Sequence, residues 1–280
     1  MRLPTVGFLG AGQIGEPMVE RLLAAGHRVS LYARRAEVRE RLPAARLVAD
    51  PVDVAASDVV VSCLYDDAQM LDVLPEIVAA MDPSTVLVSH TTGRPGTLDR
   101  LAAYAPGGEA AVVDAAFSGT AEAVRAGRLV VYLGGEPEHV ARARQVVRAY
   151  ADPVLTTGGR GSALRVKLLN NLLFAATAQL TLGGVEAGKA LGIEESILLD
   201  ALAVGSGGST AGRYIAARGG AEAFIATVTR FLRKDLEACA DLLAESGVDL
   251  SAVLSAARSG PIQVGGPSPS ETELLNEDHH

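Results

Sequence analysis

Hydrophobic residues in the first half of the 280-residue chain alternate between short continuous runs and longer periodic segments. Continuous Val, Leu and Ala runs are typical of strands that are buried on both faces of a parallel sheet. Periodic segments between such runs predict helices that cover the sheet. The runs expected to form strands are Thr5–Leu9, Arg28–Ala33, Val59–Leu64, Thr85–Ser89, Ala111–Asp114, Leu129–Leu133 and Pro153–Thr156. The helical segments between them include Pro17–Ala25, Leu71–Met81 and Val140–Ala149.

The pattern changes after the glycine-rich segment Gly158-Gly159-Arg160-Gly161. From Ser162, which we expect to be the N-cap, a helical pattern continues to Ala190 before Gly192 interrupts it. Its apolar residues fall on nearly every side, so we expect this helix to be buried, in part by a second subunit. Three later segments also have a helical pattern: Ile193–Val204, Ala221–Ala226 and Phe231–Glu245.

These patterns predict an α/β fold with two domains. Residues 1–157 are expected to form a doubly wound, mostly parallel sheet with helices on both faces. Residues 158–258 are expected to form an all-α domain, joined to the first by the long helix at residues 162–190. Residues 259–280 are rich in Gly, Pro and Ser, which predicts a loosely ordered tail.

Composition and charge narrow the classes of function. Hydrophobic residues make up 49% of the chain and charged residues 21%, an ordinary balance for a globular protein. The net charge of −8 opposes binding to a phosphate backbone, so we expect no nucleic-acid partner. Cys63 and Cys239 stand far apart in apolar stretches, which favours a reducing, cytoplasmic location.

Other classes lack their sequence signals. The most apolar stretch, residues 168–188, is interrupted by four polar residues, so no membrane span is expected. The five histidines show no metal-ligand spacing, and Asp66-Asp67 is expected to be a solvated loop rather than a metal site. A P-loop is absent, and no G-x-S-x-G pattern surrounds Ser118.

The segment Gly10-Ala11-Gly12-Gln13-Ile14-Gly15 follows the first predicted strand and opens a helix. In this setting GxGxxG is typical of the phosphate-binding turn of a Rossmann-type domain. The first glycine allows the tight turn, the second admits the pyrophosphate to the backbone, and the third lets the helix pack closely on the strand. A glycine-rich turn without a ligand is the alternative; the strand–helix setting favours the cofactor.

The end of the second predicted strand indicates which cofactor is bound. An NAD enzyme usually has Asp or Glu there to bind the ribose hydroxyls. This chain instead has Ala33 followed by Arg34 and Arg35. Because guanidinium groups bind phosphate bidentately, the sequence favours NADP(H) over NAD(H).

Lys167 lies one turn into the long apolar helix, where an ammonium group is costly unless it is paired or functional. Asn171 follows four residues later, on the same face. A partly desolvated lysine suits general acid/base catalysis of an alcohol–carbonyl interconversion. The alternative is a lysine that extends its ammonium group to solvent near the start of a helix.

Four motifs occur in a fixed order: Gly10–Gly15, Asp114–Thr120, Gly159-x-Gly161 leading to Lys167–Asn171, and Lys234-Asp235-Leu236. With them the chain resembles the β-hydroxyacid dehydrogenase family, which includes 3-hydroxyisobutyrate dehydrogenase, over about residues 3–257. The resemblance implies a helical domain that binds substrate and forms a homodimer or a dimer-based higher oligomer.

The resemblance also implies roles for individual residues. Lys167 would be the catalytic acid/base, and Asn171 would hold a small carboxylate substrate, whose carboxylate would meet Ser118, Gly119 and Thr120. The residues implied around the cofactor are Leu64, Tyr65, Thr92 and Lys234, with Asp235 orienting the surroundings of Lys234.

Three residues depart from the family pattern. Thr120 replaces a second glycine after the serine, which adds a β-branched side chain beside the expected carboxylate site. His90 and Arg94 are unusual in the loop that contains Thr92. His90 is a loop histidine, a second proton carrier or an acceptor for a cofactor hydroxyl, and Arg94 is either exposed or an anion ligand.

Two other functions remain open from the sequence. Imine reductases share this architecture and use NADPH, but typically carry Asp, Tyr or another residue where Lys167 stands. A non-catalytic NADP(H)-binding protein would not need Lys167 with Asn171. The sequence therefore favours an oxidoreductase that acts on a hydroxyacid or an aldehydo-acid.

Overall fold

The computed structural model of the chain describes residues 2–264. Two compact units divide at Leu168 and Leu169, inside the helix α7 (Ser162–Ala190). This helix covers the same residues as the predicted long helix. The predicted tail lies outside the described residues from residue 265 onward.

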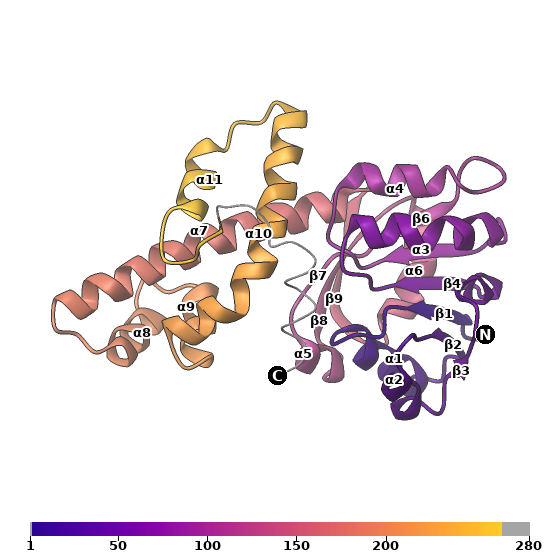
Figure 1. Cartoon of the computed structure of the whole chain (residues 1–280), viewed down its shortest axis with the longest axis horizontal. Coiled ribbons are helices and arrows are strands. Elements are labelled where there is room, and N and C mark those ends of the chain that lie inside the picture. Colours follow the sequence, from indigo (N-terminus) through magenta and orange to yellow (C-terminus); the bar gives the residue numbers. More distant parts are fainter. Residues whose placement is uncertain (1, 265–280) are drawn as a thin grey trace. The chain divides into compact units, whose positions relative to one another are not determined.

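The N-terminal unit is built on one sheet with the strand order β3-β2-β1-β4-β5-β6-β8-β7, and β9 pairs with β8. Its helices lie on both sides of the sheet (Figure 1). Strands β6 and β7 are antiparallel to β8, and all other pairs are parallel, which confirms the predicted mostly parallel sheet. The strands are β1 (Val6–Leu9), β2 (Val29–Tyr32), β3 (Arg46–Leu47), β4 (Val59–Ser62), β5 (Val86–Ser89), β6 (Ala111–Asp114), β7 (Phe117–Ser118), β8 (Leu129–Gly134) and β9 (Ala151–Gly158). The helices are α1 (Gly15–Ala24), α2 (Ala36–Arg41), the 3₁₀ helix η1 (Pro51–Ala56), α3 (Asp67–Ala80), α4 (Pro95–Ala102), α5 (Ala121–Arg125) and α6 (Pro137–Val147).

Successive residues of the central strands supply two hydrophobic cores, because side chains alternate between the faces of a sheet. In β4, for example, Val59 and Val61 join the core that contains α1 and α6. Val60 joins the core that contains α3 and α4. Burial on both faces explains why these strands read as continuous apolar runs.

The central parallel strands end at one level. The register pairs Leu9 with Ser62, Ser62 with Ser89, and Ser89 with Asp114. The residues that follow β1, β4, β5 and β6 therefore leave the sheet together at its carboxyl edge, which is where ligands bind in open α/β sheets.

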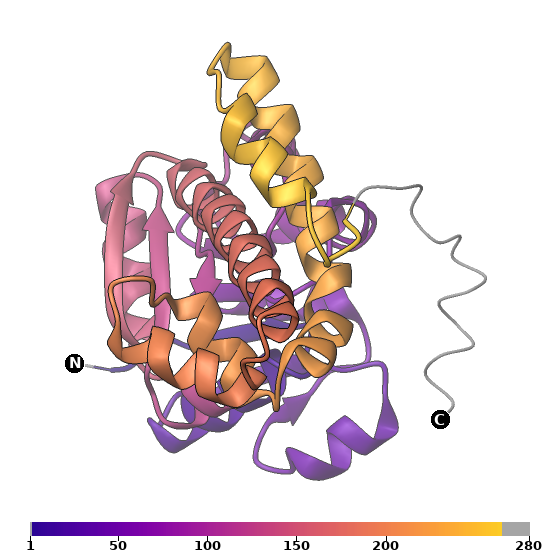
Figure 2. The same cartoon turned by 90° about the vertical axis from the view of Figure 1, so that its left-hand side faces the viewer.

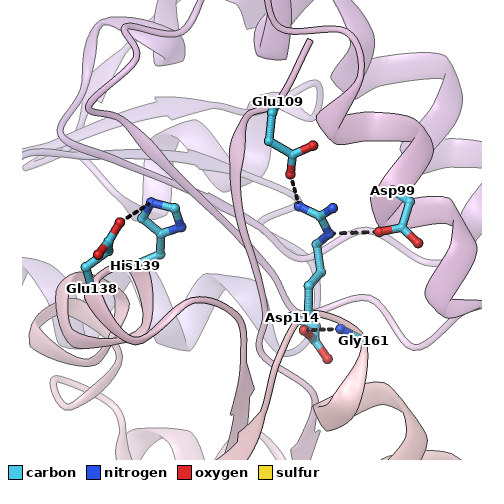
Figure 3. Close-up of polar contacts among 7 residues, drawn as sticks. Asp99, Glu109, Asp114, Glu138, His139 and Gly161 are labelled. Atoms are coloured by element: carbon cyan, nitrogen blue, oxygen red, sulfur yellow. Dashed lines mark hydrogen bonds and ion pairs between the residues drawn. The ribbon is translucent and has the colours of Figure 1, made fainter. Parts of the chain in front are cut away.

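The start of α7 is held by a side chain from the sheet. Asp114 Oδ1 accepts a hydrogen bond from Gly161 N at 2.8 Å (Figure 3). Its Oδ2 accepts one from Leu164 N at 3.0 Å. Ser162, the predicted N-cap, is instead the first helical residue, and its hydroxyl bonds the hydroxyl of Thr157. The cap thus comes from a residue distant in sequence.

Up to residue 264, the C-terminal unit contains α7 from Leu169 onward and four further helices. Of these, α8 and α9 pack together near the C-terminal end of α7 (Figures 1 and 2). The two predicted segments at 221–226 and 231–245 are one continuous helix, α10. The four helices are α8 (Glu195–Val204), α9 (Thr210–Ala217), α10 (Ala221–Ser246) and α11 (Ser251–Arg258).

Gln179 of α7 connects this unit internally. Its Nε2 donates to the carbonyls of Ala257 and Ile262, and its Oε1 accepts from Ile262 N. Ile262 and Val264 are buried. Gln179 and buried apolar contacts therefore hold Ile262 and Val264, whereas Ser259, Gly260 and Gln263 are exposed. The loosely ordered tail stays a prediction.

Helix α7 is long and apolar enough to span a membrane, with a mean hydropathy of 1.2 over its most apolar window. Half of that window is buried within the structure, and no other helix of residues 2–264 meets the same criterion. Of the polar residues that interrupt it, Asn171 and Gln179 are buried and form hydrogen bonds within the chain, whereas Glu186 is exposed. A core helix of a globular domain has the same length and composition.

Candidate functional site

The glycine turn between β1 and α1 is tightly packed at its first and third glycines. Gly10 has a φ of 85°, and a Cβ there would lie 2.1 Å from the carbonyl oxygen of Cys63. A Cβ at Gly15 would lie 2.1 Å from the carbonyl oxygen of Gly10. These glycines are required by backbone conformation and by close helix–strand packing.

The second glycine has a different environment. A Cβ at Gly12 would meet no protein atom within 4 Å, so packing within the chain does not require glycine there. Helix α1 begins at Gly15 with no side-chain cap, which leaves N–H groups at its positive end for an anion. The open space at Gly12 and the uncapped helix together fit a pyrophosphate. Of the other two predicted cofactor residues in this turn, Gln13 is exposed and Ile14 is half-buried.

Basic residues gather after β2, where cofactor choice was predicted. Arg34 and Arg35 are exposed and take part in no ion pair among the residues that the structure describes. Arg39, which sequence reasoning missed, donates from Nε to the carbonyl of Ala33 at 2.7 Å. This bond fixes a third guanidinium at the end of β2. The sequence signal that could have identified Arg39 is its position four residues after Arg35, which places both side chains on the same face of a helix.

An acid at the start of α1 is neutralised by its neighbour. Both carboxylate oxygens of Glu16 accept from Arg41, at 2.6 and 2.7 Å. The hydrogen bond from Arg41 lowers the pKa of Glu16 despite partial burial. The bidentate pair offsets a negative charge that would otherwise oppose a phosphate at this helix end.

After β4, the chain forms a structured turn. Tyr65 is exposed and donates its N–H to Gln69 Oε1, while Leu64 is half-buried and accepts from the Thr91 hydroxyl. Asp66 caps α3 by accepting from Gln69 N at 2.8 Å. The solvated loop expected at Asp66 is therefore a helix cap.

The loop after β5 is held by the neighbouring acid. Asp67 accepts from Arg94 N at 3.0 Å, and a Cβ at Gly93 would lie 2.1 Å from its carboxylate. The Arg94 guanidinium also lies 3.9 Å from Asp67. Asp67 thus orients the loop that carries the half-buried Thr92, and Arg94 is an exposed residue that interacts with this acid.

His90, in contrast, is a core residue. Its ring is 1% exposed, with Nδ1 2.6 Å from the carbonyl of Ala115 and Nε2 2.8 Å from the hydroxyl of Tyr150. A carbonyl only accepts, so Nδ1 carries the proton and Nε2 accepts from Tyr150. Burial lowers the pKa of His90 to about 4. Both nitrogens are occupied, so His90 is neither a loop histidine nor a proton carrier that faces a ligand.

The segment after β6 contains the predicted carboxylate site. Ser118 lies on the short strand β7, half-buried, and Gly119 has a φ of 138°. Thr120 is exposed, and its hydroxyl donates to Glu122 Oε2 at 2.6 Å. The register brings this segment to the same sheet edge as the glycine turn, Leu64 and Thr92.

On α7, Lys167 is half-buried and Asn171 is buried one turn later. The Asn171 side-chain amide donates to Asp235 Oδ2, and its Oδ1 accepts from Asn170 at 3.0 Å. Lys234 lies 3.9 Å from Asp235 Oδ1. Asp235, the acid of the predicted charged pair of α10, therefore orients Asn171.

Two further observations bound the site. Over the described residues, no group of three or more His, Cys, Asp or Glu side chains could hold a metal ion. A surface hollow at the start of α6, lined by residues that include Gly135, Arg144 and Thr156, contains none of the predicted site residues.

Comparison with known families agrees with this arrangement. A family model described as "NAD binding domain of 6-phosphogluconate dehydrogenase" matches residues 5–159. A second, described as "NAD-binding of NADP-dependent 3-hydroxyisobutyrate dehydrogenase", matches residues 161–259. The chain belongs to the β-hydroxyacid dehydrogenase family.

Members of the β-hydroxyacid dehydrogenase family resemble the chain along most of its length. The 3-hydroxyisobutyrate dehydrogenase of Pseudomonas aeruginosa is 26% identical over 74% of this chain and 71% of its own length. The chain spans between 62% and 72% of the length of the first curated relatives that it matches.

Solved structures of β-hydroxyacid dehydrogenases and imine reductases share the fold. The Mycobacterium tuberculosis 3-hydroxyisobutyrate dehydrogenase with L-serine has a TM-score of 0.79 at 23% identity, covering 91% of this chain and 92% of that one. A Streptomyces aurantiacus imine reductase has a TM-score of 0.63 at 22% identity, covering 91% and 93%.

Proposed function

We propose that the protein is an NADPH-dependent oxidoreductase that interconverts a short hydroxyacid and the corresponding aldehydo-acid. The observation that carries the proposal is the oriented Asn171 amide one turn from Lys167, in a chain whose glycine turn fits a dinucleotide. Family membership supports the oxidoreductase class. The Mycobacterium tuberculosis relative was solved with L-serine, a small acid that carries a hydroxyl group.

The residues that would hold NADPH divide by the part of the cofactor they suit. The turn Gly10–Gly15 and the positive end of α1 suit the pyrophosphate. Arg34 and Arg35 suit the 2′-phosphate, because guanidinium groups bind it bidentately. Leu64, Tyr65, Thr92 and Lys234 are proposed to line the rest of the cofactor site. When bound, the nicotinamide supplies a hydride to the carbonyl carbon of the substrate.

The chain's own residues would manage the proton and the orientation of the substrate. Lys167 donates a proton to the carbonyl oxygen during reduction and removes it from the hydroxyl during oxidation. Asn171, held by Asp235, binds the same substrate. Backbone N–H groups at Ser118 and Gly119 receive the carboxylate, since a turn of small residues exposes them to an anion.

Lys167→Ala tests the assignment. Loss of a general acid/base should lower kcat by about 10²- to 10⁴-fold while the Kd for NADPH stays unchanged. A screen of small aldehydo-acids and hydroxyacids by NADPH absorbance first identifies a substrate. Lys189→Ala is the matched control, because Lys189 lies on the same helix but pairs with Glu195 at 2.9 Å. Equal turnover by wild type and Lys167→Ala would refute the role of Lys167.

The Thr120–Glu122 contact favours a second candidate, the reduction of an imine. It puts a carboxylate beside the turn proposed for the substrate's own carboxylate. Solvent screens this repulsion, and a neutral or cationic imine would avoid it. Cyclic imines therefore belong in the screen. Turnover of imines alone would favour this candidate, and tight NADPH binding without any turnover would favour a non-catalytic binding protein.

We also propose that two copies associate along α7. Leu169, Leu173 and Leu180 are 39%, 58% and 69% exposed, at positions that fall along one side of the helix. Exposed leucines in a row are typical of an interface. The identity of the partner as a second copy rests on the resemblance to dimeric family members.

A further inference from the structure

Asp114 is a fully buried carboxylate to which no role was assigned from the sequence. It is the last residue of β6, and the segment Ala115–Gly119 begins directly after it. Its two oxygens accept from two N–H groups at the start of α7, those of Gly161 and Leu164. One side chain thus joins the end of a sheet strand to the start of a helix 47 residues later.

The space around this carboxylate is closed. A Cβ at Gly134 would lie 2.6 Å from Asp114 Oδ1 and 2.7 Å from the Ser162 hydroxyl. Burial raises the pKa of Asp114, and the hydrogen bonds that its carboxylate accepts from backbone N–H groups offset only part of this rise. A larger side chain does not fit beside it, so the strand end and the helix start are held at one separation.

The segment before α7 has a second anchor on the same unit. Arg160 donates from Nε to Asp99 at 2.9 Å and from Nη1 to Glu109 at 2.5 Å. Asp99 lies in the middle of α4, and Glu109 lies just before β6 (Figure 3). The first turn of α7 is therefore fixed from both sides of Gly161.

The proposed substrate turn and the proposed acid/base lie close along the chain to the two ends of this bridge. Ser118 follows Asp114 by four residues, and Lys167 follows Leu164 by three. Rigid helix geometry carries the position of Leu164 to Lys167 within one turn. Any shift at the carboxylate therefore changes the separation of the substrate turn and the acid/base.

We propose that Asp114 is a positioning residue that sets Lys167 relative to the Ser118 turn through its bonds to Gly161 and Leu164. The inference rests on the function proposed above. It differs from a purely structural cap, which would stabilise α7 without any effect specific to Lys167.

A double-mutant cycle distinguishes the two roles. Asp114→Asn should lower kcat about tenfold and Asp114→Ala about 100-fold, because misplacement by an ångström has costs of this size. In the Lys167→Ala background, measured by single turnover, the same changes should cost less than about twofold, since coupled residues are not additive. Equal factors in both backgrounds would overturn the proposal.

Asp58 provides the matched control. It accepts two hydrogen bonds from Thr5, at 2.7 and 2.8 Å, before β4 at the amino edge of the same sheet. Asp58→Asn removes a comparable carboxylate, and its effect on turnover should be the same with and without Lys167.

If no substrate is found, the proposed function fails, but the positioning role of Asp114 can still be tested by hydrogen exchange of the holoenzyme. Asp114→Asn should speed exchange at both Gly161–Leu164 and Ala115–Gly119, whereas Asp58→Asn should leave both unchanged. Faster exchange at Gly161–Leu164 alone would reduce Asp114 to a cap and overturn the positioning role. Asp114→Ser, which keeps an N-cap acceptor, provides the same readout if the asparagine variant does not fold.

Discussion

At the scale of single residues, a polar side chain can be fully occupied by the core and still influence a site. His90 lies between the rings of Phe117 and Tyr150 and holds the carbonyl of Ala115. Ala115 and Phe117 belong to the segment that leads to Ser118. The neutral ring thus helps to hold the segment that leads to the proposed substrate turn. Because the ring is buried in its neutral form, its protonation would destabilise the core.

Stability should therefore depend on pH through His90. Its pKa is about 4 in the folded protein and 6.5 ordinarily. Between these values the unfolded chain binds a proton that the folded protein does not, so the free energy of unfolding falls as pH decreases. Urea unfolding at pH 7 and pH 4.5 should show a loss of about 2–3 kcal/mol from this group. His90→Asn should lack that part of the loss, and an identical pH dependence in wild type and variant would contradict the interpretation.

Cofactor choice also belongs to the residue scale. Arg34→Asp should raise KM for NADPH by about 10- to 100-fold, the usual value of a charged hydrogen bond, and change KM for NADH far less. Steady-state kinetics with both cofactors measure the ratio. Arg128→Asp, a change at an exposed arginine before β8, is the control. A native preference for NADH would show that Arg34 and Arg35 do not select the cofactor.

Local patterns allowed the glycine turn to be predicted, because it acts through its immediate neighbours, whereas the role of Arg34 stays a prediction. Asp114 and His90 acquire their environments from residues 47, 25 and 60 positions away. No periodicity or spacing reports such pairings. The sequence therefore indicates candidate ligand-binding residues more readily than it indicates the distant residues that hold those candidates in place.

At the scale of elements, long patterns predicted helices and strands well and short ones did not. Strands β3 and β7 have two residues each, too few to show an alternation. Helix α10 was predicted as two segments because β-branched threonines separate them. In the structure, Thr227 and Thr229 donate to the carbonyls four residues earlier, and the helix continues without a break.

At the scale of the whole molecule, the exposed leucines of α7 make a prediction about assembly. Leu173→Glu with Leu180→Glu should prevent association, because each buries a charge in an apolar interface. Sedimentation equilibrium should give twice 28.9 kDa for the wild type and 28.9 kDa for the double variant.

Leu3→Glu is the control, since Leu3 is also exposed, at 46%, but lies before β1. A monomeric wild type would contradict the proposed interface. A double variant that stays dimeric would place the interface elsewhere.

The level ends of β1, β4, β5 and β6 bear on how such a protein changes during evolution. Each connecting segment at that edge begins from a strand whose position is fixed by two buried faces, so its length and side chains can vary while the sheet stays unchanged. Thr120, where the family resemblance implies a glycine, lies in one such segment. Substrate preference is thus separable from folding, and new activities are accessible through single loops.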